Sequence, residues 1–241
     1  MTNTKPILAF DTATPTARVA LISPDGECLA LRQRTAARHS ANLLALCDEV
    51  MHEAGTSVAG LAAIVCGAGP GSFTGLRVGL AVAKGLALPT GLPLVLLSSL
   101  DVLACDLAAE SPAARHVLPC IDAGKGQVYA RMYDVADSTT KAKGEADWVL
   151  FPQDLLPLAE EAASDGLLVI GGTGLDRYVD TFAALPKESV LPTLPGPSAQ
   201  SVGRMGLARL AHGQTDDIET AVPRYGRAPD ITRPKKPLLS P

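Results

Sequence analysis

Apolar and polar positions in the first third of the chain predict three short strands, a helix and a fourth strand. The apolar runs 7–10, 18–22 and 28–32 are separated by polar turns, and the Ser-Pro-Asp-Gly segment before the third run is typical of a hairpin. Residues 40–54 repeat apolar side chains at helical spacing and precede a glycine, which predicts a helix. The apolar run 61–67 then leads, as a buried strand, into a glycine-rich loop.

The second half of the chain begins with a similar pattern. A strand is predicted at 93–99 and a helix at 99–109. The next apolar run ends at Asp122, and a glycine turn and an alternating strand from Val128 to Tyr133 follow it. The first strand likewise ends at an aspartate, Asp11, before a turn and a strand. This faint repeat indicates two lobes with a boundary near residue 100.

The remaining segments complete the prediction of how the chain is divided into lobes. A strand ends at the Gly171-Gly172 turn and precedes a short helix, and residues 201–213 predict another helix. The end of the chain is rich in proline and basic residues, a composition typical of a poorly ordered tail. We therefore expect an N-terminal lobe at 1–100, a C-terminal lobe at 101–214, a segment at about 215–230 that returns to the first lobe, and a flexible tail at 232–241.

The helix expected at 74–88 has a face of small residues. Gly75, Gly79 and Ala83 recur every four residues and therefore share that face. Each glycine in a helix costs about 1 kcal/mol relative to alanine, so close packing has to compensate. Other sides of the helix are apolar too, which indicates burial nearly all round. The helix alone leaves two alternatives: an internal helix, or one packed both on its own sheet and on a partner.

The glycine loop before this helix matches no standard nucleotide motif. It ends in Gly75-Leu76-Arg77, without the lysine of a Walker loop. Ser72 and Thr74 stand where the dinucleotide fingerprint needs its third glycine. A phosphate site remains an alternative, but a tight turn that caps the helix is favoured.

Composition narrows the classes of function. The chain has 241 residues, is 47% hydrophobic and 4% aromatic, and carries a net charge of −4. The acidic balance argues against a broad nucleic-acid or anionic-membrane surface. The first residues lack the apolar core of a signal peptide, and no apolar run reaches transmembrane length. The five cysteines form no Cys-x-x-Cys pair, which is simplest for a cytoplasmic protein with reduced thiols.

Candidate catalytic groups are few. The four histidines form no His-Glu-x-x-His or His-x-x-x-His motif, and a metal pair of His116 with Cys120 is disfavoured by Pro119 between them. Asp11 and Asp122 are candidates for paired carboxylates at a cleft, or each caps its own turn. Ser72 lacks the flanking glycines of a nucleophile elbow. The residues therefore predict neither a metal nor a catalytic group.

Three segments closely resemble the bacterial TsaB family, formerly called YeaZ. They begin at residues 7, 67 and 120, and read ILAFDTATPTARVAL, GAGPGSFTGLRVGLAVAKGLA and CIDAGKGQVYARMYD. The resemblance runs from about residue 7 to 225. It implies the two-lobed α/β fold of actin-like, sugar-kinase and Hsp70-type ATPases (ASKHA), with a mixed sheet and flanking helices in each lobe. It also groups the chain with M22 glycoprotease-like proteins.

The resemblance implies a function. Members are non-catalytic subunits required to form threonylcarbamoyladenosine in tRNAs that read codons starting with A. The implied partners are a TsaD-type catalytic subunit, a TsaE-type ATPase, tRNA only through the complex, and a second copy of the chain when TsaD is absent. ATP and Mg²⁺ are then used by the complex, and no cofactor is bound tightly by this chain. The docking helices correspond to residues 40–54 and 74–88. The implied interface is Leu43, Leu44, Cys47, Met51, Phe73, Gly75, Leu76, Gly79, Leu80 and Ala83.

In this superfamily the repeated strand–aspartate–turn units are phosphate loops. The first loop here has no glycine, and Gly171-Gly172 is an incomplete adenosine motif. The resemblance therefore implies a degenerate nucleotide cleft, formed by Asp11, Thr12, Asp122, Gly171 and Gly172. An M22-type peptidase and an independent weak ATPase are the alternative functions.

Overall fold

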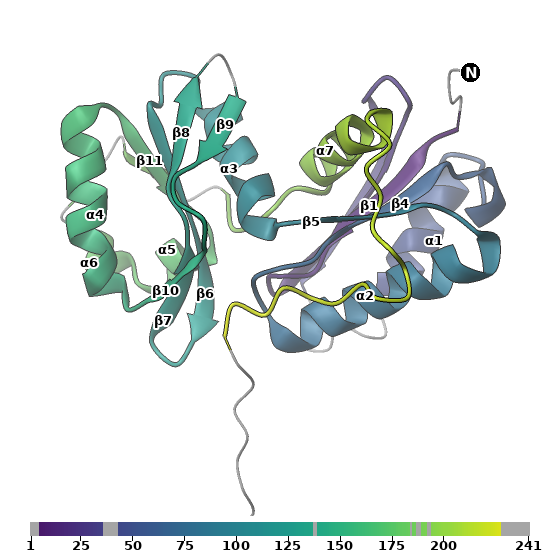
Figure 1. Cartoon of the computed structure of the whole chain (residues 1–241), viewed down its shortest axis with the longest axis horizontal. Helices are drawn as coiled ribbons and strands as arrows, with labels where there is room; N and C mark the ends of the chain where they lie inside the picture. Colours follow the sequence, from purple (N-terminus) through teal and green to yellow (C-terminus); the bar gives the residue numbers. More distant parts are fainter. Residues whose placement is uncertain are drawn as a thin grey trace, which may run out of the picture.

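A computed structural model of the chain shows two lobes, each built on one β-sheet (Figure 1). The structure describes residues 5–35, 43–136, 139–183, 185–186, 189–191 and 194–227. The start of the helix expected at 40–54 and the tail expected at 232–241 lie outside these residues.

The first sheet has five strands in the order β3-β2-β1-β4-β5. β1, β2 and β3 form an antiparallel meander, and β4 and β5 extend it in parallel with β1. The side chains of β1, β2, β4 and β5 are buried mainly because helices cover both faces of the sheet, whereas most side chains of the edge strand β3 are exposed. The strands are β1 (Ile7–Asp11), β2 (Thr16–Ile22), β3 (Cys28–Thr35), β4 (Ala63–Gly67) and β5 (Leu94–Leu97).

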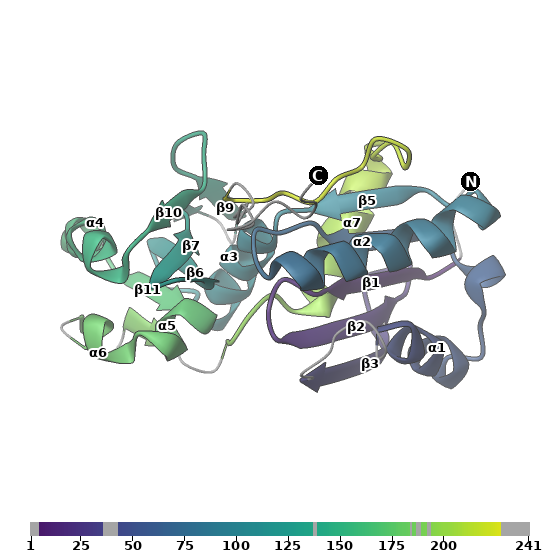
Figure 2. The ribbon, with the colours of Figure 1, turned by 90° about the horizontal axis from the view of Figure 1, so that it is seen from below.

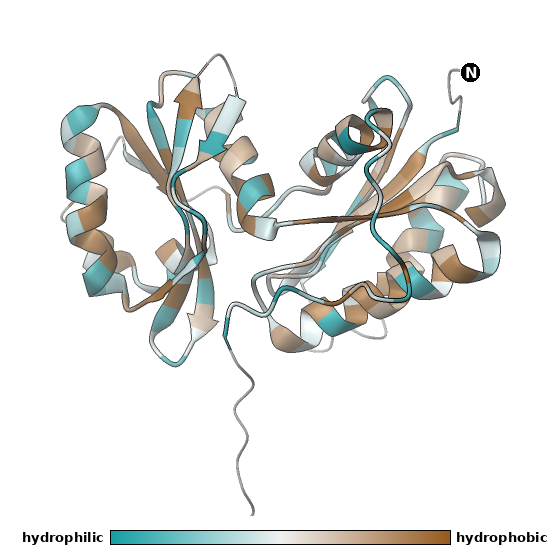
Figure 3. Cartoon of the chain, viewed as in Figure 1, coloured by the Kyte–Doolittle hydropathy of each residue, from teal (hydrophilic) through white to brown (hydrophobic). Residues whose placement is uncertain are grey.

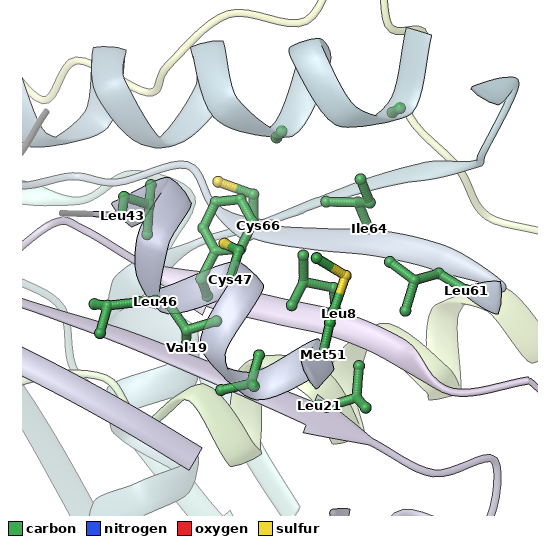
Figure 4. Close-up of a cluster of buried hydrophobic side chains, with 14 of the residues drawn as sticks. Leu8, Val19, Leu21, Leu43, Leu46, Cys47, Met51, Leu61, Ile64 and Cys66 are labelled. Atoms are coloured by element: carbon green, nitrogen blue, oxygen red, sulfur yellow. The ribbon is translucent and has the colours of Figure 1, made fainter. Parts of the chain in front are cut away.

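Helices α1 and α2 cover one face of this sheet and α7 covers the other (Figure 1). In Figure 4, Cys47 and Met51 of α1 point to the sheet residues Leu8 and Cys66. The helical elements of this lobe are α1 (Leu43–Glu53), η1 (Val58–Gly60), α2 (Phe73–Ala87), η2 (Leu88–Thr90) and α7 (Ala199–Ala211).

The position of α7 corrects the lobe boundaries expected from the sequence. The sequence places residues 201–213 in the second lobe, but α7 packs on β1 and β2 of the first sheet. Its small residues explain the contact. A Cβ at Gly203 would lie 2.3 Å from Ile22, and one at Gly206 would lie 2.4 Å from Val65. The chain therefore enters the second lobe and returns.

The second sheet follows the order β10-β7-β6-β11-β12, with β8 pairing β6 and β9. α3 packs on one face of it, and α4, α5 and α6 pack on the other (Figure 1). Its strands are β6 (His116–Gly124), β7 (Gln127–Ala130), β8 (Tyr133–Ala136), β9 (Thr139–Ala142), β10 (Trp148–Leu150), β11 (Leu168–Gly171) and β12 (Val190–Leu191). Its helices are α3 (Ser99–Glu110), α4 (Pro152–Asp165), α5 (Thr173–Arg177) and α6 (Val179–Phe182).

The alternating strand expected from Val128 to Tyr133 is interrupted. β7 ends at Ala130 and β8 begins at Tyr133, yet both pair with β6 in one antiparallel register. The alternation of apolar and polar residues therefore predicted that this segment pairs as a strand, but not that the strand is interrupted between Ala130 and Tyr133. Along the described residues, no helix combines the length and apolar character needed to cross a bilayer.

Candidate functional site

The glycine loop between β4 and α2 is packed against the rest of the lobe. Its backbone N–H groups donate to the chain itself: Ala68 to Leu97 O, Gly69 to Ser99 Oγ and Ser72 to Ala13 O. A Cβ at Gly71 would lie 2.3 Å from Ala13 O. These three donors are satisfied internally and are therefore not available to a phosphate. The loop is the turn that the sequence favoured, and Ser72 Oγ caps α2 by accepting from Gly75 N at 3.2 Å.

The small-residue face of α2 points inward, which corrects its assignment to a partner interface. A Cβ at Gly75 would lie 2.1 Å from Thr12 O, and one at Gly79 would lie 2.4 Å from Thr12 Oγ1. Thr12 Oγ1 also donates to Gly75 O at 2.8 Å. The glycines thus let the turn after β1 approach the helix backbone.

Most of the other residues expected at the interface belong to the lobe's own core. Only Leu44, 54% exposed, and Phe73, 41% exposed, lie on the surface among the ten. The buried residues are Leu43, Cys47, Met51, Gly75, Leu76, Gly79, Leu80 and Ala83. Apolar spacing identified the helices correctly, but the set mixed core-facing positions with surface ones.

The outer face of α2 carries a compact aromatic cluster in which Phe73, expected at the interface, is joined by Arg77 and Tyr225, which the sequence did not indicate. The Arg77 guanidinium lies 4.0 Å from the centroid of the Phe73 ring. Its Nε donates to Tyr225 Oη at 3.0 Å, and the Phe73 and Tyr225 ring centroids are 5.0 Å apart. Cation–π and ring contacts therefore hold three exposed side chains in one arrangement. Figure 3 shows α2 mostly brown or pale, with isolated teal positions.

Tyr225 reaches α2 because the C-terminal strap, defined here as residues 216–227, lies along the first lobe and ends at the second. Asp216 Oδ2 accepts from Leu96 N at 2.7 Å, and Arg224 N donates to Ala68 O at 2.8 Å. Arg227 Nη1 then donates to Gln127 Oε1 of β7 at 3.1 Å. Figure 2 shows this yellow segment passing from α7 toward the second lobe. The strap connects both lobes to the outer face of α2.

A cleft of about 580 Å³ lies between the lobes. Asp122, at the end of β6, lines it and pairs with Arg177 of α5 at 3.1 Å. The other carboxylate oxygen accepts from Gly124 N at 3.0 Å and from Tyr178 Oη at 3.3 Å. Asp122 is therefore held in place by its own lobe and its charge is paired.

Asp11 and Thr12 do not line this cleft. Both are buried, and Asp11 accepts from Ala13 N and Ser99 Oγ, each at 2.7 Å. Burial raises the pKa of Asp11, while these two hydrogen bonds act in the opposite direction. The structure therefore separates the two aspartates that the sequence offered as a pair: one faces the cleft and the other lies inside the first lobe.

Gly171 and Gly172 serve the packing of the second lobe. Gly172 has φ +117°, and a Cβ there would lie 2.3 Å from Cys120 O. The next residue, Thr173, lines the cleft, and its Oγ1 accepts from Asp122 N at 3.0 Å. Gly172 thus lets α5 begin close to β6, and Gly171 is the last residue of β11.

The described residues contain no group of three His, Cys, Asp or Glu side chains that could hold a metal ion. His116, a metal candidate from the sequence, bridges two carboxylates instead. Its Nδ1 lies 2.8 Å from Asp134 Oδ1, and its Nε2 lies 3.2 Å from Asp165 Oδ2. Both ring nitrogens are therefore engaged within the lobe.

Comparison with known proteins gives consistent similarities. The family model described as TsaD, tRNA N6-adenosine threonylcarbamoyltransferase, matches residues 33–167. The chain is 33% identical to the tRNA threonylcarbamoyladenosine biosynthesis protein TsaB of Escherichia coli K12, over 92% of this chain and 94% of the relative. It is 37% identical to the protein of that name from Haemophilus influenzae, over 51% of each chain.

Solved structures agree with these matches. YeaZ from Pseudomonas aeruginosa has a TM-score of 0.78 at 29% identity, over 92% of this chain and 99% of that one. An activator of 2-hydroxyisocaproyl-CoA dehydratase from Clostridium difficile has a TM-score of 0.51 at 9% identity, over 86% of this chain and 96% of that one. The second likeness concerns the fold alone.

Proposed function

Since the chain belongs to the TsaB family of tRNA threonylcarbamoyladenosine biosynthesis proteins, we propose that it acts as a non-catalytic subunit that docks on a TsaD-type subunit. The observation that carries this proposal is the exposed cluster of Phe73, Arg77 and Tyr225 on the outer face of α2. Aromatic and arginine side chains supply most of the binding energy of many protein interfaces. Here three of them are held in place before any partner binds, which lowers the entropy cost of docking.

The proposed docking surface replaces the one expected from the sequence. It consists of the outer face of α2, the exposed side of α1 at Leu44, and the strap residue Tyr225. The inward glycines contribute by fixing α2 on the lobe rather than by touching a partner. In the absence of a TsaD-type subunit, the same surface is proposed to bind a second copy of the chain.

The rest of the molecule favours a non-catalytic role. Asp11 is buried away from the cleft, Asp122 is paired with Arg177, and the glycine loop has no free N–H donors at Ala68, Gly69 or Ser72. We therefore assign ATP and Mg²⁺ to the complex, including a TsaE-type ATPase, and not to a tight site on this chain. Contact with tRNA is proposed only within the complex, and the location is proposed to be the cytoplasm.

Co-purification with the TsaD-type protein of the same organism tests the docking surface. Phe73→Asp places a charge in the centre of the proposed contact and should weaken binding at least tenfold, with the melting temperature of the free chain nearly unchanged. Phe151→Asp is the matched control, because Phe151 is 44% exposed on the second lobe and precedes α4, where aspartate is a good cap. Normal binding by Phe73→Asp would contradict the proposal.

The alternative functions have a separate test. Peptidase and ATPase assays on the isolated chain should show no turnover above that of a control preparation. Turnover that co-purifies with the chain, and that is lost when Asp122 is replaced by asparagine, would instead favour an enzyme with its site in the cleft.

A further inference from the structure

A second hollow, of about 500 Å³, lies on the α7 side of the first sheet, away from α1 and α2. Its floor is formed by Thr16 and Arg18 of β2 with Gln33 and Thr35 of β3, and its wall by residues 194–196 and Ser198, which lead into α7. Arg18 stands opposite Gln33, and Thr16 opposite Thr35, in the β2–β3 register. The four side chains therefore project from the same face of the sheet.

Arg18 is the unusual member of this group. Arg18 as a whole is only 8% exposed, so most of its side chain is buried in the lobe. Nη1 donates to Thr14 Oγ1 at 3.2 Å and to Thr16 O at 3.4 Å. Within the described part of the chain, Arg18 forms no ion pair, and neither Nε nor Nη2 donates a hydrogen bond. A buried arginine without a paired carboxylate is rare, because the charge is costly to desolvate.

The unpaired nitrogens of Arg18 are not fully buried. Among the described residues, the one buried side-chain nitrogen or oxygen that lacks a partner is Nε of Arg131. Nε and Nη2 of Arg18 are thus not enclosed by protein, and Arg18 lines the hollow. A Cβ at Gly196, in the wall of the hollow, would lie 3.3 Å from Nη1, so the chain before α7 packs closely against the guanidinium.

Two carboxylates lie near Arg18 but are engaged elsewhere. Asp11 stands opposite Arg18 in the β1–β2 register, and its oxygens accept from Ala13 N and Ser99 Oγ. Asp106 of α3 accepts from the backbone and hydroxyl of Ser198 and from Ser201 Oγ. Burial lowers the pKa of the Arg18 guanidinium, and the attraction of these two carboxylates at longer range acts in the opposite direction. The carboxylates also repel an incoming anion, and the repulsion is twice as large for a dianion as for a monoanion.

We propose that this hollow binds a small monocarboxylate, held in a bidentate pair by Nε and Nη2 of Arg18. The planar guanidinium fork matches the spacing of carboxylate oxygens, and charge-assisted pairs of this kind are stronger than hydrogen bonds between neutral groups. The Thr16 and Thr35 hydroxyls hydrogen-bond to each other at 2.7 Å, so the donors for the rest of the ligand are the Gln33 amide and the one hydroxyl that accepts in this bond. The site is independent of the proposed docking surface, which lies on the other side of the sheet.

Titration of the full chain with sodium acetate tests the site by NMR, with sodium chloride at matched ionic strength as the reference. Acetate should produce saturable shifts of the backbone amides of Thr16, Arg18 and Gly196, and chloride should not. Gln33→Glu should weaken acetate binding at least tenfold, because the new carboxylate stands opposite Arg18 and competes for it. Gln33 is exposed, so this variant should fold normally.

Arg34→Gln is the matched control. It lowers the net charge by one, as Gln33→Glu does, but Arg34 pairs with Glu49 and does not line the hollow. Its acetate affinity should equal that of the wild type. Shifts that fail to saturate, equal affinity in Gln33→Glu, an equal loss in Arg34→Gln, or inorganic phosphate binding as tightly as acetate would each overturn the proposal.

Discussion

Replacing Gly79 by alanine tests how α2 is held on its lobe. The added methyl group would lie 2.4 Å from Thr12 Oγ1, which is far inside van der Waals contact. Thr12 is fully buried and its hydroxyl donates to Gly75 O, so it cannot move without losing that bond. The substitution therefore forces either α2 or the turn after β1 to shift.

The magnitude follows from three effects. Overpacking in a core costs about 1–3 kcal/mol, and loss of a buried hydrogen bond costs about 1 kcal/mol more. Alanine regains about 1 kcal/mol of helix propensity relative to glycine. The net loss in the free energy of unfolding should be about 2 kcal/mol, which lowers the melting temperature by about 4–8 °C for a chain of this size.

Gly85→Ala provides the matched control on the same helix. A Cβ at Gly85 would meet nothing within 4 Å, so only the propensity gain remains. This variant should melt about 2–4 °C higher than the wild type. Chemical and thermal unfolding of the two variants gives the comparison directly. If Gly79→Ala were as stable as Gly85→Ala, the inward packing of the glycine face would be wrong, and the face would again be available to a partner.

Three further outcomes are expected. Isothermal calorimetry of the isolated chain with ATP should give a dissociation constant weaker than about 10 μM, and tighter binding would contradict the degenerate cleft. Burial raises the pKa of the Asp11 carboxyl above 3.8, so the native state binds the carboxyl proton more tightly than the unfolded chain does. The free energy of unfolding should therefore fall as the pH rises from 3.8 through the pKa of the folded state. Melting curves against pH should show that Asp11→Asn lacks this fall; parallel curves would refute it. Among the thiols, Cys28 is exposed, whereas burial raises the pKa of Cys47 to about 12. A thiol reagent at neutral pH should therefore react with native Cys28 first, and Cys28→Ser should remove the fast phase.

Local patterns in the sequence predicted most of the first lobe because its elements have clear periods. The apolar runs at β1, β2 and β4 and the helical spacing in α1 and α2 were each sufficient to identify an element. α4 was missed, since Pro152 and Pro157 stand within its span. Pro152 is at the first turn, where proline is tolerated, but composition alone reads such a segment as a loop.

Contacts between distant segments could not be predicted in the same way. The spacing of Gly75 and Gly79 indicates that they share a face of the helix. It does not indicate that Thr12, 63 residues before Gly75, packs against that face. Small residues on a helix are equally consistent with an internal neighbour and with a partner. Which of the two packs on the glycines depends on the turn after β1. The sequence of that turn does not indicate that it contacts a helix.

The contact between the strap and the docking surface could not be predicted from the sequence either. Tyr225 lies 148 residues from Arg77, in a proline-containing segment without helical or strand periodicity, so no pattern in the chain connects the two. Backbone bonds fix its place: Arg224 N donates to Ala68 O, at the end of the same strand that leads into α2. The loop that sets the start of α2 therefore also positions the ring that packs on its outer face. A change in this loop should alter both the core contact of the glycines and the surface cluster, because one short segment supports the two sides of the helix.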